Sequence, residues 1–443
     1  MGHRPLRVAA LVDLERWPSA GGHVKCWERL AQAAARHPGA IDLTVHFESA
    51  GAVEAREELA PHVRIETHRP VFSTRRLGFL KAIADHTDLA PLHPRLLRSL
   101  ANVDVIHTTD AYFAYARTAM HVSRRGIPLT TSIHTNTPGY APVYTEQAIH
   151  AVLGNGAPAR LLTNTLRVPE RAATAMRNRL VRHARACARV LVGERDDLDA
   201  ARALFGDRVG RLRRGIDRAQ FSPERRDRRR FATEYGIAPG RFVLFYAGRV
   251  DVGKSVMDVA RATRMLLDRG LPVHLLMAGE GKDAPAILEL LGPHATLPGY
   301  LPPSDMAWLY ASADLFVFPS RVEVSPNVVL EAKASGLPVI VAAQGGGIFV
   351  SVPGEDGIVV DDHAVGVWAD AIESLLADPS RRQALAAAGY EDMVRHRPDW
   401  DQVFEEDLVP VWEAAWTDRQ RQHEAAAAGQ PLPPRDPVGA ART

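Results

Sequence analysis

The sequence is poor in cysteine and in long apolar runs. Its 443 residues include only two cysteines, Cys26 and Cys187. Two thiols cannot form a disulfide framework, and these two lack the spacing of a metal site, so a reducing cytoplasm fits best. No stretch approaches the ~18–20 consecutive apolar residues of a membrane span. The first apolar run ends at Asp13, which predicts a β-strand rather than a signal peptide.

A strong net charge of one sign is also lacking. The 54 Lys+Arg and 52 Asp+Glu leave +2, which argues against a nucleic-acid partner. The total hides a split, because residues 1–217 hold 31 basic and 21 acidic side chains (+10), whereas 218–443 hold 23 and 31 (−8). Basic segments with interspersed apolar residues lie at 73–100 and 167–189. They fit either an anionic membrane surface or ordinary solvated helices.

Short β-rich runs alternate with helical patterns along the chain, as in parallel sheets covered on both faces. At roughly 100–200 residues per domain, the length allows two or three domains. The fold class we expect is α/β, with two doubly wound Rossmann-like domains facing across a cleft. The expected strands are 6–13, 42–48, 63–67, 103–108, 128–134, 189–193, 209–216, 242–248, 273–278, 315–319 and 338–342, and the main expected helices are 22–36, 167–188, 254–269, 303–313, 327–335, 363–377, 380–394 and 400–416.

Charge runs and Pro/Gly punctuation suggest the domain boundaries. We expect an N-terminal domain over 1–215, an inter-domain connection over 216–240 and a C-terminal domain over 241–398. A helix over 399–417 is expected to pack back toward the N-terminal domain. The tail 418–443 has little apolar content, which predicts disorder.

Residues 248–255 read GRVDVGKS, which satisfies the pattern G-x-x-x-x-G-K-[ST] of P-loop nucleoside triphosphatases. The segment follows a predicted strand and precedes a predicted helix, as that function requires. Bulky and acidic residues fill the loop, however, and the following strands lack a clean terminal Asp for magnesium. A P-loop NTPase is therefore kept as one alternative.

The same loop carries a second pattern. Arg249 is followed five residues later by Lys254, one of only five lysines in the chain. Downstream, RVEVSPNVVLEAKASGLPVIVA places Glu323 in a strand-end loop and Glu331, eight residues on, inside a predicted helix. The residues 325–327 lie at the start of that helix, where free backbone amides and the helix dipole can hold a phosphate.

This combination resembles the retaining glycosyltransferases of family 4, also called group 1, which have the GT-B fold of two Rossmann-like domains. The resemblance covers about 1–415 and is densest at 243–360, including AGRVDVGKS, GEG at 279–281, LPGYLPPSDMAWLYASADLFVFPS and EAKASGLPVI. It implies transfer of a hexose from a UDP- or GDP-sugar to an acceptor with retention of anomeric configuration. The nucleotide sugar is a substrate, and neither a cofactor nor a metal is expected.

The resemblance also implies residue roles. Arg249 and Lys254 correspond to cations that neutralise the donor diphosphate, whose charge grows as the glycosidic bond breaks. Glu331 corresponds to the carboxylate that accepts the ribose hydroxyls, and Glu323 to a residue contacting the donor sugar. The implied catalytic residues are thus Arg249, Lys254, Glu323 and His134, and the implied donor-binding residues are Gly21, Gly22, Gly248, Gly281, Tyr300, Ser325, Pro326, Asn327, Val328 and Glu331.

The segment SIHTNTPGYAPVY at 132–144 bears on the acceptor. A strand-end histidine is by itself more often structural, but in the family a histidine at the place of His134 contacts the donor sugar. Thr135, Tyr140 and Tyr144 resemble the subset that glycosylates membrane lipids and are the predicted acceptor-binding residues. The expected partners are a nucleotide-sugar donor and a lipid or glycan acceptor, and an anionic inner membrane face is left open as a further partner. A non-catalytic nucleotide- or carbohydrate-binding module is the third alternative.

Two positions depart from the family pattern. The Glu that commonly follows the Gly-Gly turn at 345–346 is missing, because Ile348, Phe349 and Val350 stand there. Ser255 follows Lys254 where the family usually has glycine.

Overall fold

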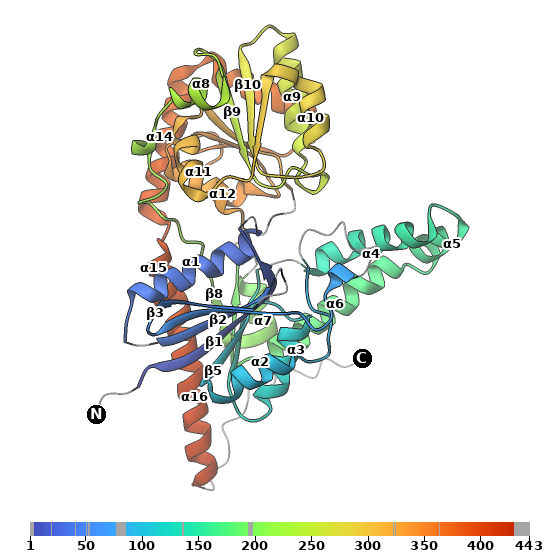
Figure 1. The fold of residues 1–443 in the computed structure, drawn as a ribbon, viewed down its shortest axis with the longest axis vertical. Coiled ribbons are helices and arrows are strands. Elements are labelled where there is room, and N and C mark those ends of the chain that lie inside the picture. Colours follow the sequence, from blue (N-terminus) through green and yellow to red (C-terminus); the bar gives the residue numbers. More distant parts are fainter. Residues whose placement is uncertain are drawn as a thin grey trace. The chain divides into compact units, whose positions relative to one another are not determined.

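The computed structural model describes residues 4–18, 20–39, 41–49, 51, 54–76, 86–134, 137–193, 198–321, 323, 325–362 and 364–428. The chain divides into two compact units (Figure 1). Unit 1 comprises 1–213 together with 400–443, and unit 2 comprises 214–399. Each unit is built on a parallel sheet with helices on both faces, which confirms the predicted α/β class.

The sheet of unit 1 has eight strands in the order β3-β4-β2-β1-β5-β6-β7-β8. All neighbours are parallel except β3 and β4, which pair antiparallel. β3 (AREELA), which was not predicted, is an exposed edge strand whose charges discourage further strand pairing. The strands are β1 (Leu6–Arg16), β2 (Ile41–Ser49), β3 (Ala55–Ala60), β4 (Val63–His68), β5 (Val105–Thr108), β6 (Leu129–Ser132), β7 (Arg189–Val192) and β8 (Val209–Arg211).

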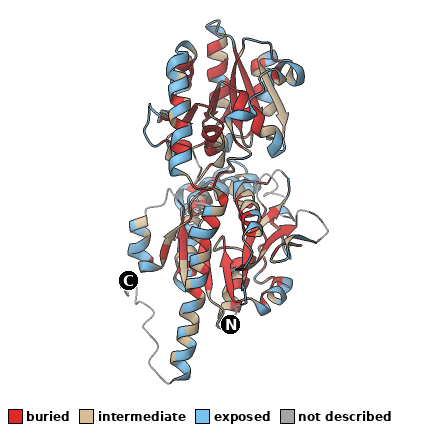
Figure 2. Ribbon diagram, turned by 90° about the vertical axis from the view of Figure 1, so that its left-hand side faces the viewer, coloured by how far each residue is buried: buried red, intermediate tan, exposed pale blue. Residues whose placement is uncertain are grey.

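Helices cover both faces of this sheet and leave their outer faces exposed (Figure 2). The amphipathic α1 buries Trp27 and Leu30 against Val8, Ala10 and Val12 of β1. The opposite face of β1 packs against α3. The helices are α1 (Gly22–Arg36), α2 (Pro94–Ser99), α3 (Ala114–Ser123), α4 (Thr137–Leu153), α5 (Ala157–Arg160), α6 (Val168–Ala186), α7 (Leu198–Phe205), α15 (Trp400–Gln402) and α16 (Val409–Ala427), with a π-helical turn at Leu161–Thr165 before α6 and another at Val403–Leu408 joining α15 to α16.

The C-terminal segment of the chain belongs to unit 1. Trp412 of α16 is fully buried in the core that α1 and β1 share. The prediction of disorder from residue 418 is wrong for the first ten residues of the tail, because α16 continues to Ala427. Asp418 pairs with Arg189 of β7, and the alanines that follow favour helix. Residues 429–443 lie outside the described residues.

Between β6 and β7 the chain forms a helical arm, defined here as residues 137–186. In this arm α4 and α6 pack side by side, with α5 at the turn between them (Figure 1). Of this arm, the sequence predicted α6, as a helix over 167–188, but neither α4 nor α5.

The sheet of unit 2 has six parallel strands in the order β11-β10-β9-β12-β13-β14. The chain builds outward from β9 in one direction and then returns to add β12 on its other side. The boundary between β9 and β12 is thus a topological switch point, where ligands of open α/β sheets bind. The strands are β9 (Phe242–Ala247), β10 (Val273–Ala278), β11 (Ala295–Gly299), β12 (Leu315–Phe318), β13 (Val339–Ala342) and β14 (Ile358–Val360).

The segment 216–240, predicted as a connection between domains, packs within unit 2. Phe221, Phe231 and Ile237 are buried in the core of this unit, and the rings of Phe231 and Trp308 lie 5.3 Å apart. The helices are α8 (Arg230–Tyr235), α9 (Val256–Asp268), α10 (Ala284–Leu291), α11 (Pro303–Ser312), α12 (Asn327–Ala334), α13 (Val365–Ala377) and α14 (Pro379–His396).

A buried cation fixes α12 within unit 2. The Lys333 ammonium is 1% exposed and donates to the Phe349 carbonyl, Asp356 Oδ2 and Asp392 Oδ2, each at 2.8 Å. These three bonds join α12 to the loop before β14 and to α14.

Candidate functional site

The candidate donor site lies in strand-end loops of unit 2. Arg249 follows β9, Gly281 follows β10, Tyr300 follows β11 and Glu323 follows β12. Because the strands are parallel, their carboxyl ends meet at one edge of the sheet, where such folds bind ligands.

An ion pair bridges the switch point. The Lys254 ammonium donates to Glu323 Oε1, and the Ser320 hydroxyl donates to the same oxygen at 3.4 Å. The side chains of Lys254 and Glu323 are 15% and 22% exposed. The structure therefore brings together two predicted residues that are 69 positions apart, and the contact joins the loops after β9 and β12.

Arg249 lies at the same edge with its side chain 38% exposed. Its Nε is 3.5 Å from Asp251 Oδ2. Its backbone carbonyl accepts a hydrogen bond of 2.7 Å from the Tyr246 hydroxyl. Burial and the nearby Glu323 and Asp251 hold the pKa of Tyr246 well above its usual value, so this hydroxyl keeps its proton and anchors the loop.

A buried tyrosine that the sequence analysis missed positions Glu331. The Tyr310 hydroxyl of α11 donates to Glu331 Oε2 at 2.9 Å. Burial, followed by the charge of Glu331, holds the pKa of Tyr310 well above its usual value. Glu331 itself is partly exposed on α12. Tyr310 and Glu331 lie on different helices, so the spacing of residues within one motif could not predict this contact.

The start of α12 carries unsatisfied polar groups. Its N-cap residue is Pro326, which is buried, and no side chain caps the helix. Ser325 Oγ and Asn327 Oδ1 are buried, and neither has a hydrogen-bond partner among the described residues. Buried polar atoms are normally paired, so these two, beside the partly buried Val328, favour contact with a ligand.

Glycine is required where the loops after β9 and β10 cross. A Cβ at Gly281 would lie 2.0 Å from the Val250 carbonyl oxygen, and one at Gly279 would lie 1.9 Å from the Gly248 carbonyl oxygen. Gly248 itself has φ +139°. These glycines allow backbone to touch backbone and thereby shape the edge that carries Arg249.

Several amides of the loop 248–255 are already bonded to backbone carbonyls. The Gly248 N–H donates to the Ala278 carbonyl at 3.0 Å, and the Val250 N–H donates to the Glu280 carbonyl at 2.9 Å. The Lys254 N–H donates to the Asp251 carbonyl, also at 2.9 Å. A phosphate-wrapping loop needs such amides turned toward the phosphates, so the geometry disfavours the NTPase alternative.

The region of the missing Glu is apolar. Residues 346–349 form one 3₁₀ turn, and Phe349 and Val350 are buried while Ile348 is partly buried. A Cβ at Gly345 would lie 1.7 Å from the Ser320 carbonyl oxygen, so this turn packs directly on the loop that leads to Glu323.

In unit 1, His134 follows β6 and is 6% exposed. Its Nε2 accepts a hydrogen bond from Trp27 Nε1 at 3.2 Å and lies 2.8 Å from Ser132 Oγ. Its ring stacks on His23 with centroids 4.3 Å apart. The histidine is therefore held by α1 and β6 rather than loosely placed on a loop.

The other predicted residues of unit 1 are less defined. Gly21 is the N-cap of α1 without a side-chain cap, and a Cβ on Gly22 would meet nothing within 4 Å. Tyr144 is exposed on α4. Tyr140 lies in α4, with its side chain outside the description, and Thr135 lies outside the described residues.

Buried acids cluster near the carboxyl ends of β1, β2 and β5. Burial raises the pKa of Glu48 to about 7 and that of Asp110 to about 6. Burial and hydrogen bonding to Glu48 raise the pKa of Asp13 well above its usual value. These groups were not predicted, although Asp13 ends the apolar run within β1 and Asp110 follows β5.

Among the described residues, one group could bring three metal-ligating atoms close together: His46, Glu66 and His68 of β2 and β4. His46 Nδ1 and His68 Nε2 are only 2.9 Å apart. Two nitrogens bound to one tetrahedral zinc at ~2.0–2.1 Å would be about 3.3 Å apart, so this contact is a direct hydrogen bond.

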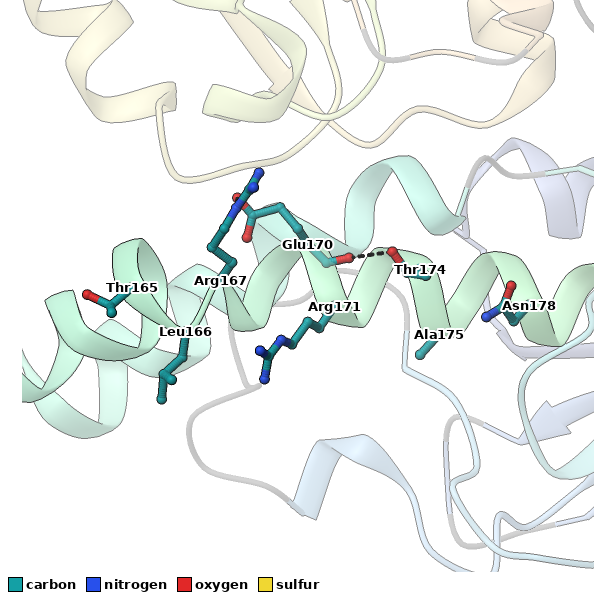
Figure 3. Close-up of a pocket in the computed structure, with 8 residues that line it drawn as sticks. All are labelled: Thr165, Leu166, Arg167, Glu170, Arg171, Thr174, Ala175 and Asn178. Carbon is teal, nitrogen blue, oxygen red and sulfur yellow. Dashed lines mark hydrogen bonds and ion pairs between the residues drawn. The ribbon is translucent and has the colours of Figure 1, made fainter. Parts of the chain in front are cut away.

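A pocket lies on the arm, along the first turns of α6 (Figure 3). Arg167 and Arg171 project from its lining, and Leu166 beside them is exposed. The remaining lining residues are Thr165, Glu170, Thr174, Ala175 and Asn178. The pocket therefore combines two cations with apolar surface.

Two units with parallel sheets, and a polar cluster at the switch point of the second, define the GT-B class of glycosyltransferases. Residues 227–392 match the sequence profile of the glycosyl transferases group 1. D-inositol 3-phosphate glycosyltransferase 1 of Catenulispora acidiphila is 30% identical over 311 residues, covering 67% of this chain and 69% of that protein. The chain therefore belongs to the group 1 glycosyltransferases, as the resemblance predicted.

A further relative agrees with this family, and a solved structure has a similar fold. The sulfoquinovosyl transferase of Arabidopsis thaliana is 27% identical over 316 residues, which is 70% of this chain and 57% of that protein. The solved structure of Anabaena HepE in complex with UDP-glucose has a TM-score of 0.61 at 16% identity, covering 93% of this chain and 100% of that one. No helix within the described ranges is long and apolar enough to cross a membrane.

Proposed function

We propose that the protein transfers a hexose from a UDP- or GDP-sugar, with retention of anomeric configuration and without a metal or other cofactor, to a lipid or glycan acceptor. The observation that carries this proposal is the Lys254–Glu323 ion pair across the switch point. It sets a cation for the leaving diphosphate beside a carboxylate for sugar hydroxyls. HepE, with the same fold, was solved with UDP-glucose bound.

In this mechanism Arg249 and Lys254 bind the diphosphate of the donor. As the bond between the anomeric carbon and the phosphate oxygen breaks, negative charge builds on the leaving diphosphate, and fixed cations stabilise that state more than the ground state. Glu331, held by Tyr310, accepts the ribose hydroxyls. Ser325 and Asn327 offer their buried oxygens to the donor near the start of α12.

Retention follows from attack on the face that the leaving group vacates. The acceptor oxygen bonds to the anomeric carbon, and its proton passes to the departing phosphate oxygen. Glu323 is not assigned as a nucleophile, because its contact with Lys254 neutralises much of its charge. It contacts sugar hydroxyls instead.

The arm is proposed to receive a lipid acceptor at an anionic membrane surface. Val152, Leu161 and Leu166 expose 64%, 51% and 39% of their surface on the arm. Residues 137–186 contain seven arginines against two glutamates. Apolar side chains beside clustered arginines suit an interface with anionic headgroups. The composition of the arm is therefore the observation that supports a lipid acceptor.

The donor is tested by thermal shift and by transfer. A panel of UDP, GDP and their hexose conjugates should raise the melting temperature only for the preferred base and sugar, because ligand binding stabilises the fold by mass action. Transfer should survive chelation with EDTA. NMR of the product should show the anomeric configuration of the donor, and an inverted product would refute retention.

The acceptor side is tested separately with vesicles. Co-flotation should occur with vesicles containing phosphatidylglycerol and fail with phosphatidylcholine alone, and Leu161→Ser/Leu166→Ser should weaken it. A matched control is Leu288→Ser, an exposed leucine on α10 of unit 2. Equal flotation of both variants and of both vesicle types would remove the membrane from the proposal and leave a soluble glycan acceptor.

A further inference from the structure

A chain of buried hydrogen bonds leads from the C-terminal helix to His134. Trp412 Nε1 of α16 donates to His107 Nδ1 at 3.2 Å. His107 Nε2 lies 2.9 Å from Ser132 Oγ, and Ser132 Oγ lies 2.8 Å from His134 Nε2. The residues before His134 in this chain are at most 1% exposed. All belong to unit 1, although Trp412 and His107 are 305 positions apart.

The direction of this chain follows from which atoms carry hydrogen. An indole nitrogen can only donate, so His107 Nδ1 accepts from Trp412. Burial lowers the pKa of His107 to about 3, so the ring is neutral and its one hydrogen is on Nε2. His107 Nε2 therefore donates to Ser132 Oγ, which lies 2.9 Å away.

The same reasoning continues to His134. Because Ser132 Oγ accepts from His107, its own hydrogen is available to His134 Nε2. Trp27 Nε1 donates to that same nitrogen. With two donors directed at it, Nε2 is an acceptor, and the hydrogen of the neutral ring is on Nδ1.

We infer that Trp412, His107 and Ser132 are positioning residues that, together with the Trp27 N–H, hold His134 in its Nδ1–H tautomer. The imidazole then acts as a hydrogen-bond donor through Nδ1 and cannot remove a proton from substrate through Nε2. A role for this donor in transfer rests on the proposed function. The tautomer itself does not, since it follows from the bonds within unit 1 alone.

The tautomer can be measured without any substrate. In protein labelled with ¹⁵N-histidine, long-range ¹H–¹⁵N correlations show which ring nitrogen carries hydrogen, and H107Q and H134Q assign the two signals. We expect Nε2–H for His107 and Nδ1–H for His134 near neutral pH. Nε2–H for His134 in the unaltered protein would overturn the inference.

Two variants test the origin of the tautomer. Trp412→Phe keeps an aromatic ring but removes the N–H, which leaves His107 Nδ1 with the Thr130 hydroxyl 2.8 Å away. The His107 and His134 signals should therefore both shift. Turnover should fall about fivefold, the loss expected for one hydrogen bond, with the KM for the donor unchanged. Trp400→Phe, which alters another tryptophan of the same core, should change neither readout.

Ser132→Ala is the second variant in case Trp412→Phe does not fold. It removes one oxygen, and the His107 and His134 signals should both change. Unchanged His107 and His134 ¹⁵N signals in both folded variants would overturn the inference. Absence of transfer by the unaltered protein, with the expected tautomers present, would instead refute the proposed function alone.

Discussion

The two units solve the burial of polar groups in different ways. Unit 2 places most of its functional groups at an accessible strand-end edge, and its most buried charge, Lys333, is matched by Asp356 and Asp392. Unit 1 buries acids and histidines together, and burial shifts the pKa of several of them, including Glu48 upward and His107 downward. The buried Lys333 of unit 2 is thus stabilised by paired charges, whereas burial favours the neutral forms of Glu48 and His107 in unit 1.

Net charge describes this difference poorly. Redrawn at the structural boundaries, unit 1 holds 34 basic and 28 acidic side chains (+6), and unit 2 holds 20 and 24 (−4). Much of the apparent polarity of the two sequence halves came from the acidic C-terminal segment, which belongs to the basic unit. The placement of individual charges, rather than their sum, locates the chemistry.

The largest expected effect on stability comes from breaking the buried charge pairing of unit 2. Lys333→Met removes the ammonium and leaves Asp356 and Asp392 without their buried cation. Breaking such a group costs about 3–5 kcal/mol. Hydrogen exchange should show lost protection across unit 2, with unit 1 little changed. Replacing both aspartates by Asn in the Lys333→Met background should recover part of the loss, and a single variant as stable as the parent would contradict the pairing argument.

The next effect concerns activity rather than stability. Lys254→Ala should lower the turnover number about 10²–10³-fold, the cost of removing one preorganised group that stabilises transition-state charge. Arg264→Ala on α9, a partly exposed residue paired with Asp268, is the matched control and should retain activity. Steady-state transfer kinetics with the preferred donor measure both, and equal activity of the two variants would exclude Lys254 from the site.

How far the sequence predicted the molecule also differs between the units. In unit 2, β-α alternation placed β9, β10, β12 and β13 to within a residue or two but missed β11, β14 and α10. Parallel strand ends brought Lys254 and Glu323 together there. In unit 1, the sequence missed β3, α4 and the buried polar groups. These depend on contacts between distant positions, such as Trp412 and His107, which leave no periodic or motif signal in the sequence.

A pH-dependent prediction sharpens the description of unit 1. The folded-state pKa of Glu48 is raised to about 7 from 4.5, so its contribution to stability is fully present below pH ~4.5 and is lost as pH rises through about 7. Glu48→Gln mimics the protonated acid. It should therefore become progressively more stable than the parent between pH 5 and 7.5, by up to about 2–3 kcal/mol.

Denaturant unfolding at several pH values measures this difference. Glu58→Gln, on the exposed edge strand β3 of the same sheet, should show no such trend. The buried histidines act in the opposite direction, because His107 and His183 stay neutral in the folded state and cost stability as pH falls below about 6.5. A constant offset between Glu48→Gln and the parent at all pH values would show that Glu48 does not titrate in this range.

The smallest expected effect tests a feature that the units share. Arg167 before α6 and Ser255 before α9 are the non-glycine residues with positive φ among those described, at +48° and +54°. A left-handed conformation costs an L-residue roughly 1–2 kcal/mol, and glycine avoids this cost. Glycine also makes the unfolded chain more flexible, which offsets part of that gain. Arg167→Gly and Ser255→Gly should each therefore stabilise the protein by about 0.5–1 kcal/mol in denaturant unfolding.

The matched Ala variants remove the same side chains but keep the strained Cβ, so their free energy of unfolding should not rise. If Ala stabilises as much as Gly, the side chain and not the backbone is responsible, and the glycine usual in the family after Lys254 would need another explanation.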